Sequence, residues 1–144
     1  MKPTRGMLLM LLSCVAHAQA ADAGDYFGRW RISAIADYAK VAAVSDARAK
    51  RKIGGDLVLS AHAVTFDHRT CRPRYALSTV DPEKDLEDGY RITNQTLKLP
   101  NPVVLIDTGC QRNRFIYVAN AKQLVIEQSG VFYRADRVDV AEGK

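Results

Sequence analysis

The fold of this 144-residue chain is decided by residues 114–134, which read RFIYVANAKQLVIEQSGVFYR. Three apolar runs (114–119, 123–128 and 131–134) are separated here by two short turn sequences. Successive side chains of a strand point to opposite faces of its sheet, and turns this short join antiparallel neighbours. The stretch therefore predicts three consecutive antiparallel strands.

Short runs with the same two-residue period precede this stretch. Trp30, Ile32 and Ala34 share one face of the first run, and residues 60–63 form the turn of a hairpin. Val103 to Asp107 is apolar on both faces, which is typical of a central, buried strand. Further runs are expected at 57–59, 64–66, 75–77, 90–92 and 97–99. The pattern predicts an all-β fold, an antiparallel barrel of about eight strands, with a β-sandwich as the alternative.

One segment, Ser45 to Lys52, departs from the strand period. It is rich in Ala, Lys and Arg, with Ser45 as a helix N-cap and Gly54-Gly55 as a stop signal. We expect one short helix around residues 45–52. Its basic run, Arg48 to Lys52, is interpreted as a solvated helix face, which is also suited to contact anionic lipid headgroups.

Residues 1–20 have the three parts of a secretory signal peptide. Two basic residues precede the apolar run 7–12, and residues 16–20 supply two Ala-x-Ala cleavage sites. The apolar run is shorter than the roughly 18–20 residues that span a bilayer. The sequence predicts export to the periplasm or beyond, which leaves residues 21–144 as a single β-barrel domain.

The signal contains a second cleavage option. Leu11-Leu12-Ser13-Cys14 resembles a bacterial lipobox, in which the cysteine is lipidated and becomes the first mature residue. Under this alternative Cys14 anchors the protein to the bacterial envelope, and this anchor is its membrane contact. Otherwise Cys14 is removed with the signal peptide, and the protein is periplasmic or secreted.

The charge balance argues against one class of partner. The formal net charge is +5, and removal of residues 1–20 takes away Lys2 and Arg5 and no acidic residue, which leaves +3. This is far from the strongly basic stripe of a dedicated nucleic-acid-binding domain. No nucleic-acid partner is predicted.

Two cysteines, Cys71 and Cys110, remain after the signal segment. In an oxidising compartment they have one way to pair, and the bond closes a loop of roughly 40 residues. The chain-entropy model then gives about 4 kcal/mol of stabilisation as an upper value. There is no Cys-x-x-Cys spacing, so a structural disulfide is predicted, with no redox site and no metal site.

Each cysteine lies in an arginine-rich stretch, so the disulfide would gather five arginines: Arg69, Arg72, Arg74, Arg112 and Arg114. Guanidinium groups bind carboxylates and phosphates through paired hydrogen bonds, which makes this cluster a candidate site for an anionic partner. Alternatively, alternation along the strands turns the arginines to different faces, where water solvates them. The acidic segment 81–88, expected to be a loop, could also neutralise them.

Gly28-Arg29-Trp30 in the first predicted strand resembles the Gly-x-Trp motif of lipocalin-like (calycin) barrels. In that family an arginine near the end of the last strand packs over the tryptophan. The resemblance implies that Trp30 is structural and that Arg134 or Arg137 has this role. It further implies a barrel that could carry a small apolar ligand.

Asp107-Thr108-Gly109 matches the Asp-Thr-Gly of aspartic proteases, but only 35 residues follow Gly109. In single-domain proteases of that type the motif lies near the domain's start. The segment is better interpreted as a buried strand that ends in a turn. The two histidines after the signal, His62 and His68, have no close ligand spacing. No catalytic residue, metal ligand or cofactor is predicted.

The sequence favours a non-catalytic exported binding protein that holds a protein or a small ligand in the periplasm. An inhibitor or immunity-type module is one form of this class. The alternatives are a carrier of a small apolar ligand inside a lipocalin-like barrel, and a hydrolase that uses Asp107.

Overall fold

The computed structural model describes residues 22–139. The predictions made for residues 1–20, lipidation of Cys14 included, lie outside this range. Among residues 22–139 no helix is long and apolar enough to cross a membrane.

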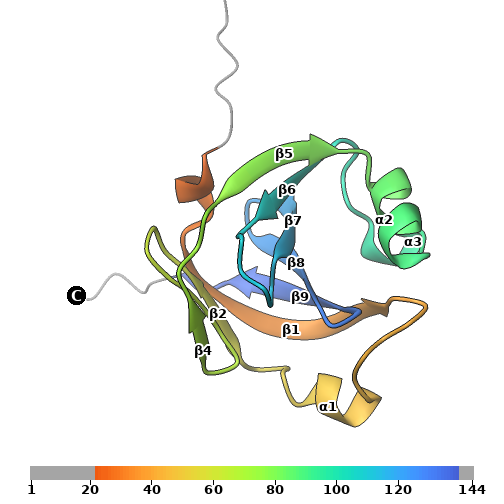
Figure 1. The fold of residues 1–144 in the computed structure, drawn as a ribbon, viewed down its shortest axis with the longest axis horizontal. Helices are drawn as coiled ribbons and strands as arrows, with labels where there is room; N and C mark the ends of the chain where they lie inside the picture. The colour runs from red at the N-terminus through yellow and green to blue at the C-terminus, as the bar shows by residue number, and fades with distance from the viewer. Residues whose placement is uncertain (1–21, 140–144) are drawn as a thin grey trace, which may run out of the picture.

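Residues 22–139 form one antiparallel sheet of nine strands, preceded by a 3-10 turn, η1 (Ala23–Tyr26). The strands are β1 (Gly28–Tyr38), β2 (Asp56–Leu59), β3 (Val64–Phe66), β4 (Arg69–Cys71), β5 (Ala76–Val80), β6 (Val103–Asp107), β7 (Phe115–Asn120), β8 (Gln123–Gln128) and β9 (Val131–Arg137). Their order in the sheet is β4-β3-β2-β1-β9-β8-β7-β6-β5. The sheet curls into a half-barrel (Figure 1), which confirms the predicted all-β, barrel-like fold.

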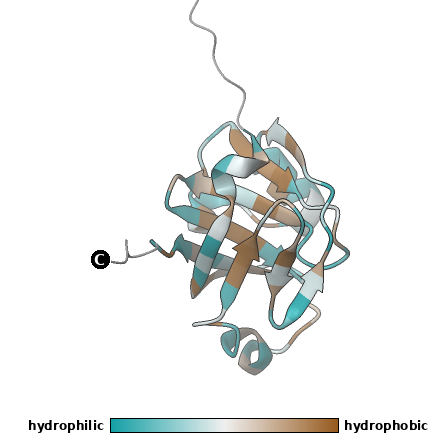
Figure 2. Ribbon diagram, turned by 90° about the vertical axis from the view of Figure 1, so that its left-hand side faces the viewer, coloured by the Kyte–Doolittle hydropathy of each residue, from teal (hydrophilic) through white to brown (hydrophobic). Residues whose placement is uncertain are grey.

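The inner face of the curl is filled with apolar side chains. Trp30, Phe66 and Tyr133 are each at most 2% exposed and belong to one cluster with aliphatic residues of β2, β6, β7 and β8. Figure 2 shows how apolar and polar residues alternate along the strands. This alternation sends one set of side chains into the curl, as the two-residue period predicts.

Two helices, α2 (Pro82–Tyr90) and α3 (Asn94–Leu97), connect β5 to β6. Leu86 and Leu97 are fully buried in a second apolar cluster, which includes residues of β6 to β9 that face away from the first cluster. The expected acidic loop at 81–88 and the expected strands at 90–92 and 97–99 are therefore wrong. The physical reason is a strong helix start, in which Asp81 caps the helix by accepting from the Glu83 N–H and Pro82 takes its first position.

The predicted helix near Ser45 is confirmed as α1 (Asp46–Lys50). The Ser45 hydroxyl accepts a hydrogen bond from the Arg48 N–H, and Lys50 pairs with Asp46 at 2.7 Å. Ala49 is fully buried and anchors the helix to the core. The rest of α1 projects away from the sheet in both views (Figures 1 and 2).

The two edges of the sheet, β4 and β5, are joined by residues 72–75 and are not paired to each other. The predicted disulfide between Cys71 and Cys110 is present, with Cα atoms 6.0 Å apart, and ties β4 to the loop that follows β6. The Arg74 N–H donates to the Thr108 carbonyl at 2.8 Å. The opening of the half-barrel is thus closed by a covalent bond and loop contacts.

Candidate functional site

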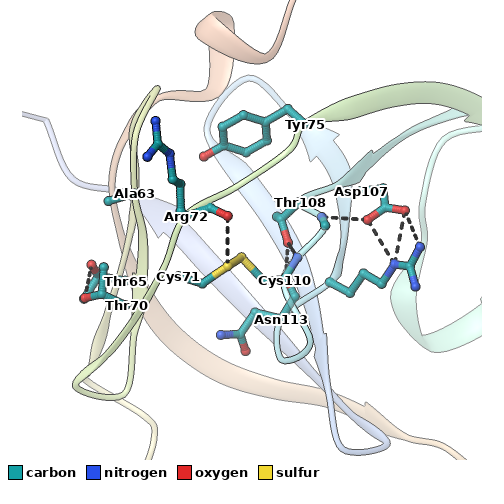
Figure 3. The surroundings of a disulfide bond; sticks show 12 residues. Ala63, Thr65, Thr70, Cys71, Arg72, Tyr75, Asp107, Thr108, Cys110 and Asn113 are labelled. Atoms are coloured by element: carbon teal, nitrogen blue, oxygen red, sulfur yellow. Dashed lines mark hydrogen bonds and ion pairs between the residues drawn. A yellow bond between two sulfur atoms is a disulfide. The ribbon is translucent and has the colours of Figure 1, made fainter.

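The loop between β6 and β7 has a fixed shape around the disulfide (Figure 3). Thr108 is fully buried, and its hydroxyl donates to the Asn113 carbonyl at 3.0 Å and accepts from the Cys110 N–H at 3.2 Å. Gly109 has φ +72°, and a Cβ there would lie 3.2 Å from the Arg74 backbone. This geometry sets the position of the residues that follow Cys110.

Asp107, the first residue of the Asp-Thr-Gly segment, is held by an ion pair. Its carboxylate accepts from the Arg114 guanidinium at 3.1 Å and from the Gly109 N–H at 2.8 Å. The hydrogen bond from Arg114 lowers the pKa of Asp107. The segment is thus the end of β6 followed by a turn, and the Asp107 carboxylate forms an ion pair with Arg114.

Only two of the five predicted arginines meet at a common hollow. Arg69, the first residue of β4, and Arg112, in the β6–β7 loop, line it together, whereas Arg72, Arg74 and Arg114 do not. Figure 3 shows Arg72 extending away from the side on which Asp107 lies. The disulfide brings the two arginine-rich segments together, but their arginines do not converge on one hollow. Arg72 and Arg74 lie in the loop that follows β4, and Arg114 pairs with Asp107.

The hollow shared by Arg69 and Arg112 is also lined by three cations from the other basic run of the sequence. We call it the basic hollow; its volume is about 590 Å³, and its lining is Ala43, Val44, Arg48, Arg51, Lys52, Asp67, Arg69, Arg112, Gln128 and Ser129. Five of these side chains are basic, and Asp67 is the acidic one. The fold thus joins two basic stretches that are separate in the sequence.

Two tight turns place the residues around this hollow. Asp67 and His68 have φ of 51° and 60°, and Ser129 and Gly130 have φ of 55° and 80°. Positive φ at both central residues is the mark of the type I′ turns that match the twist of a two-strand hairpin. The Ala43 N–H donates to the Ser129 carbonyl at 2.9 Å, which fixes the segment that leads into α1.

The electrostatics of the hollow are unbalanced. The Lys52 ammonium pairs with Asp67 at 2.7 Å and lies 5.3 Å from the centre of the Phe66 ring. The hydrogen bond from Lys52 lowers the pKa of Asp67, so this pair is ionised and close to neutral overall. The other four basic side chains have no carboxylate within 4.0 Å among residues 22–139: Arg48, Arg51, Arg69 and Arg112.

Two buried amide side chains lie beside these arginines. Gln128 lines the basic hollow, and Asn113 lines an adjoining hollow of about 490 Å³ that shares Arg69 and Arg112. Gln128 is 8% exposed and Asn113 is 7% exposed. Within the described part of the chain, their side-chain oxygens have no hydrogen-bond partner. Polar groups without partners are uncommon in packed regions, and here they flank the concentration of positive charge.

A second hollow lies where α2 meets the sheet. We call it the acidic groove; it has a volume of about 650 Å³ and is lined by Val80, Asp81, Lys84, Asp85, Asp88, Gly89, Tyr90, Leu105, Phe115 and Tyr117. The buried Tyr117 hydroxyl donates to Asp85 at 2.6 Å. Burial, followed by this hydrogen bond, raises the pKa of Tyr117, and burial raises the pKa of Tyr90 to about 12. Both tyrosines are therefore neutral and structural.

Trp30 lies near the start of β1. It is fully buried, and the Arg137 guanidinium lies 4.4 Å from the centre of its ring. Arg134 does not contact Trp30 in this way; its guanidinium donates to the carbonyls of Thr96 and Leu97 at 2.8 and 3.1 Å. Of the two arginines expected to cover Trp30, Arg137 does so, and the assignment to Arg134 is corrected.

The contributions of Arg48, Arg51 and Lys52 to the basic hollow were missed by sequence reasoning. The sequence predicts the short helix that carries or adjoins them, but nothing in the sequence places α1 beside the turn after β3. Among the described residues, no group of three or more His, Cys, Asp or Glu side chains could hold a metal ion.

Comparisons of the chain with protein-family models, with curated proteins and with solved structures gave no match. The resemblance to lipocalin-like barrels therefore stays a prediction. A barrel-like fold does not by itself indicate a function, because one fold serves many activities.

Proposed function

We propose that this protein is a non-catalytic binding protein, exported to the periplasm, that holds an anionic small ligand in the basic hollow. One observation carries the proposal: four arginines without carboxylate partners, from α1 and its C-terminal cap, the start of β4 and the β6–β7 loop, line one hollow. A planar guanidinium group binds phosphate or carboxylate through two parallel hydrogen bonds.

The dimensions support a small molecule. A volume of about 590 Å³ falls within the range of roughly 300–1,000 Å³ that is usual for ligand sites. The inner face of the half-barrel, where a carrier would hold its ligand, is filled by Trp30, Phe66 and Tyr133. A surface hollow is therefore the better-supported binding site.

The neighbouring carboxylates support binding over catalysis. Asp67 pairs with Lys52 and Asp107 pairs with Arg114, and in each case the hydrogen bond to the cation lowers the carboxyl pKa. A general base works best with a pKa near the working pH, and these two groups are shifted in the opposite direction. The inhibitor and immunity-type interpretations stay predictions.

The proposal is tested by isothermal titration calorimetry of the disulfide-bonded protein with inorganic pyrophosphate. We expect saturable binding that weakens as salt is added, because the arginines are exposed. The double variant Arg69→Gln/Arg112→Gln should bind at least about tenfold more weakly, since each charged hydrogen bond contributes roughly 1.5–3 kcal/mol.

Arg114→Gln is the matched control, because Arg114 belongs to the same arginine-rich loop but pairs with Asp107. Its pyrophosphate affinity should stay within about twofold of the parent value, the range expected for an exposed charge outside the site. Absence of binding to the parent protein, or an equal loss in the control, would overturn the proposal.

A further inference from the structure

Two of the three large apolar side chains that residues 22–139 expose flank α1. Val41, in the segment before the helix, is 86% exposed, and Ile53, just after it, is 43% exposed. The third, Val58, is 38% exposed and lies on β2 within the sheet. A single exposed apolar residue needs no explanation, but two on either side of a projecting basic helix form a pattern.

The helix between them is held firmly in its projecting position. Ala49 is fully buried, and its carbonyl accepts from the Tyr133 hydroxyl at 3.4 Å. The Tyr38 hydroxyl donates to Asp46 at the start of the helix. Val41 is held from the other side, because Gly130 lies so close that a Cβ there would be 2.8 Å from the Val41 carbonyl. The positions of α1 and of the Val41 backbone are thus set by the fold.

The basic hollow lies beside the same helix. Arg48, Arg51 and Lys52 line it, and Ala43, two residues after Val41, lines it as well. Exposed apolar side chains next to clustered Lys and Arg are the two features by which proteins bind an anionic membrane surface. The apolar groups enter the headgroup boundary, and the cations pair with lipid phosphates.

We propose that the basic hollow binds the phosphate headgroup of an anionic phospholipid while Val41 and Ile53 insert into the bilayer surface. The inference rests on the proposed function, since it names the source of the anionic group. Val41 also lines a further hollow with Gly89 and Tyr90 of α2, and the charged side chains there are Lys40, Arg91 and Glu127. Two of these three are basic, so the charge around Val41 also favours an anionic surface.

The test is flotation of the disulfide-bonded protein with two kinds of vesicle, one of phosphatidylcholine alone and one that also contains phosphatidylglycerol. We expect binding only to the vesicles with phosphatidylglycerol, and competition by free pyrophosphate. Val41→Ser/Ile53→Ser should reduce vesicle affinity roughly tenfold or more, because about five apolar carbons no longer insert. Its affinity for free pyrophosphate should not change.

Two controls separate the lipid inference from the proposed function. Val80→Ser makes the same Val-to-Ser change at the acidic groove and should leave vesicle binding intact. If the protein binds pyrophosphate but not vesicles, or if Val80→Ser and the double variant lose vesicle affinity equally, the lipid inference is overturned and the proposed function still stands. If the protein binds vesicles but does not bind pyrophosphate, and pyrophosphate does not reduce vesicle binding, both the proposed function and the lipid inference are overturned.

Discussion

The basic hollow and the acidic groove are nearly the same size, about 590 and 650 Å³, and each forms where a short helix meets the sheet. Their charges are opposite. The basic hollow has four arginines without carboxylate partners, whereas three aspartates and one lysine line the acidic groove beside aromatic rings. Size alone would not distinguish them, so the chemistry of the lining has to decide which of them binds a ligand.

The two regions also differ in how their charged groups are used. In the acidic groove, Asp85 accepts from the Tyr117 hydroxyl, and Asp81 caps α2 by accepting from the Glu83 N–H. In the basic hollow, Lys52 is paired and the arginines are not. Charge at α2 thus contributes to the fold, while charge at α1 remains available for a ligand. The following predictions test this division.

Removing the disulfide is expected to have the largest combined effect, because it lowers both stability and ligand affinity. Cys71→Ser/Cys110→Ser opens a loop with a sequence separation of 39 residues, so the free energy of unfolding should fall by about 4 kcal/mol at most. Arg69 and Arg112 each lie two residues from a cysteine, so pyrophosphate affinity should fall as well. Urea unfolding and calorimetry measure the two effects. Unchanged affinity in the folded variant would show that the loops hold the hollow without the bond.

The next effect separates stability from binding at α2. Leu86 is a residue of α2, and its side chain is fully buried. Leu86→Ala should lower the free energy of unfolding by about 2–5 kcal/mol, through lost apolar contact and the cavity that remains. Pyrophosphate affinity at the basic hollow should be unchanged, because α2 contributes no residue to it. A parallel loss of affinity in protein that is still folded would contradict the division between the two regions.

The two regions also differ in how much of their structure can be predicted from the sequence. The strand turns at 60–63 and 129–130 and the helix near Ser45 follow from local signals, namely alternation, turn residues and an N-cap. At α2 two local signals compete. Tyr90 and Ile92 have the spacing of a strand, yet the capping sequence Asp81-Pro82 starts a helix that buries Leu86.

The basic hollow could not be predicted, and the sequence left both Arg134 and Arg137 as candidates for the Trp30 contact, because both features depend on strand register and order. Arg137 lies directly opposite Trp30 in the pairing of β1 with β9, and this register chooses it over Arg134. Arg51 and Arg69 line the same hollow because the β3–β4 hairpin lies beside α1. Local sequence contains neither relationship, and the composition shows only a mild excess of positive charge.

The smallest effect is expected at Asp67, the acidic residue of the basic hollow. The direction in which anion affinity changes with pH follows from the pKa of this carboxyl group. Lys52 lowers the pKa of Asp67, so the carboxylate is ionised at neutral pH and weakens anion binding. Asp67→Asn should increase sulfate affinity by about threefold, a change typical of one nearby charge in water. In the parent protein the same increase should appear only as the pH falls below the usual carboxyl pKa of about 4, when Asp67 takes up a proton.

The same protonation has the opposite effect on stability. Because the folded-state pKa is lowered, the Lys52–Asp67 pair stabilises the protein above the unfolded-state pKa, and this contribution is lost as the pH falls through the folded-state pKa. Sulfate titrations and urea unfolding at matched pH values therefore move in opposite directions for the parent protein. In Asp67→Asn, sulfate affinity and the free energy of unfolding should both change less over the same pH interval. If sulfate affinity in the variant rises with acid as steeply as in the parent, a group other than Asp67 governs charge in the basic hollow.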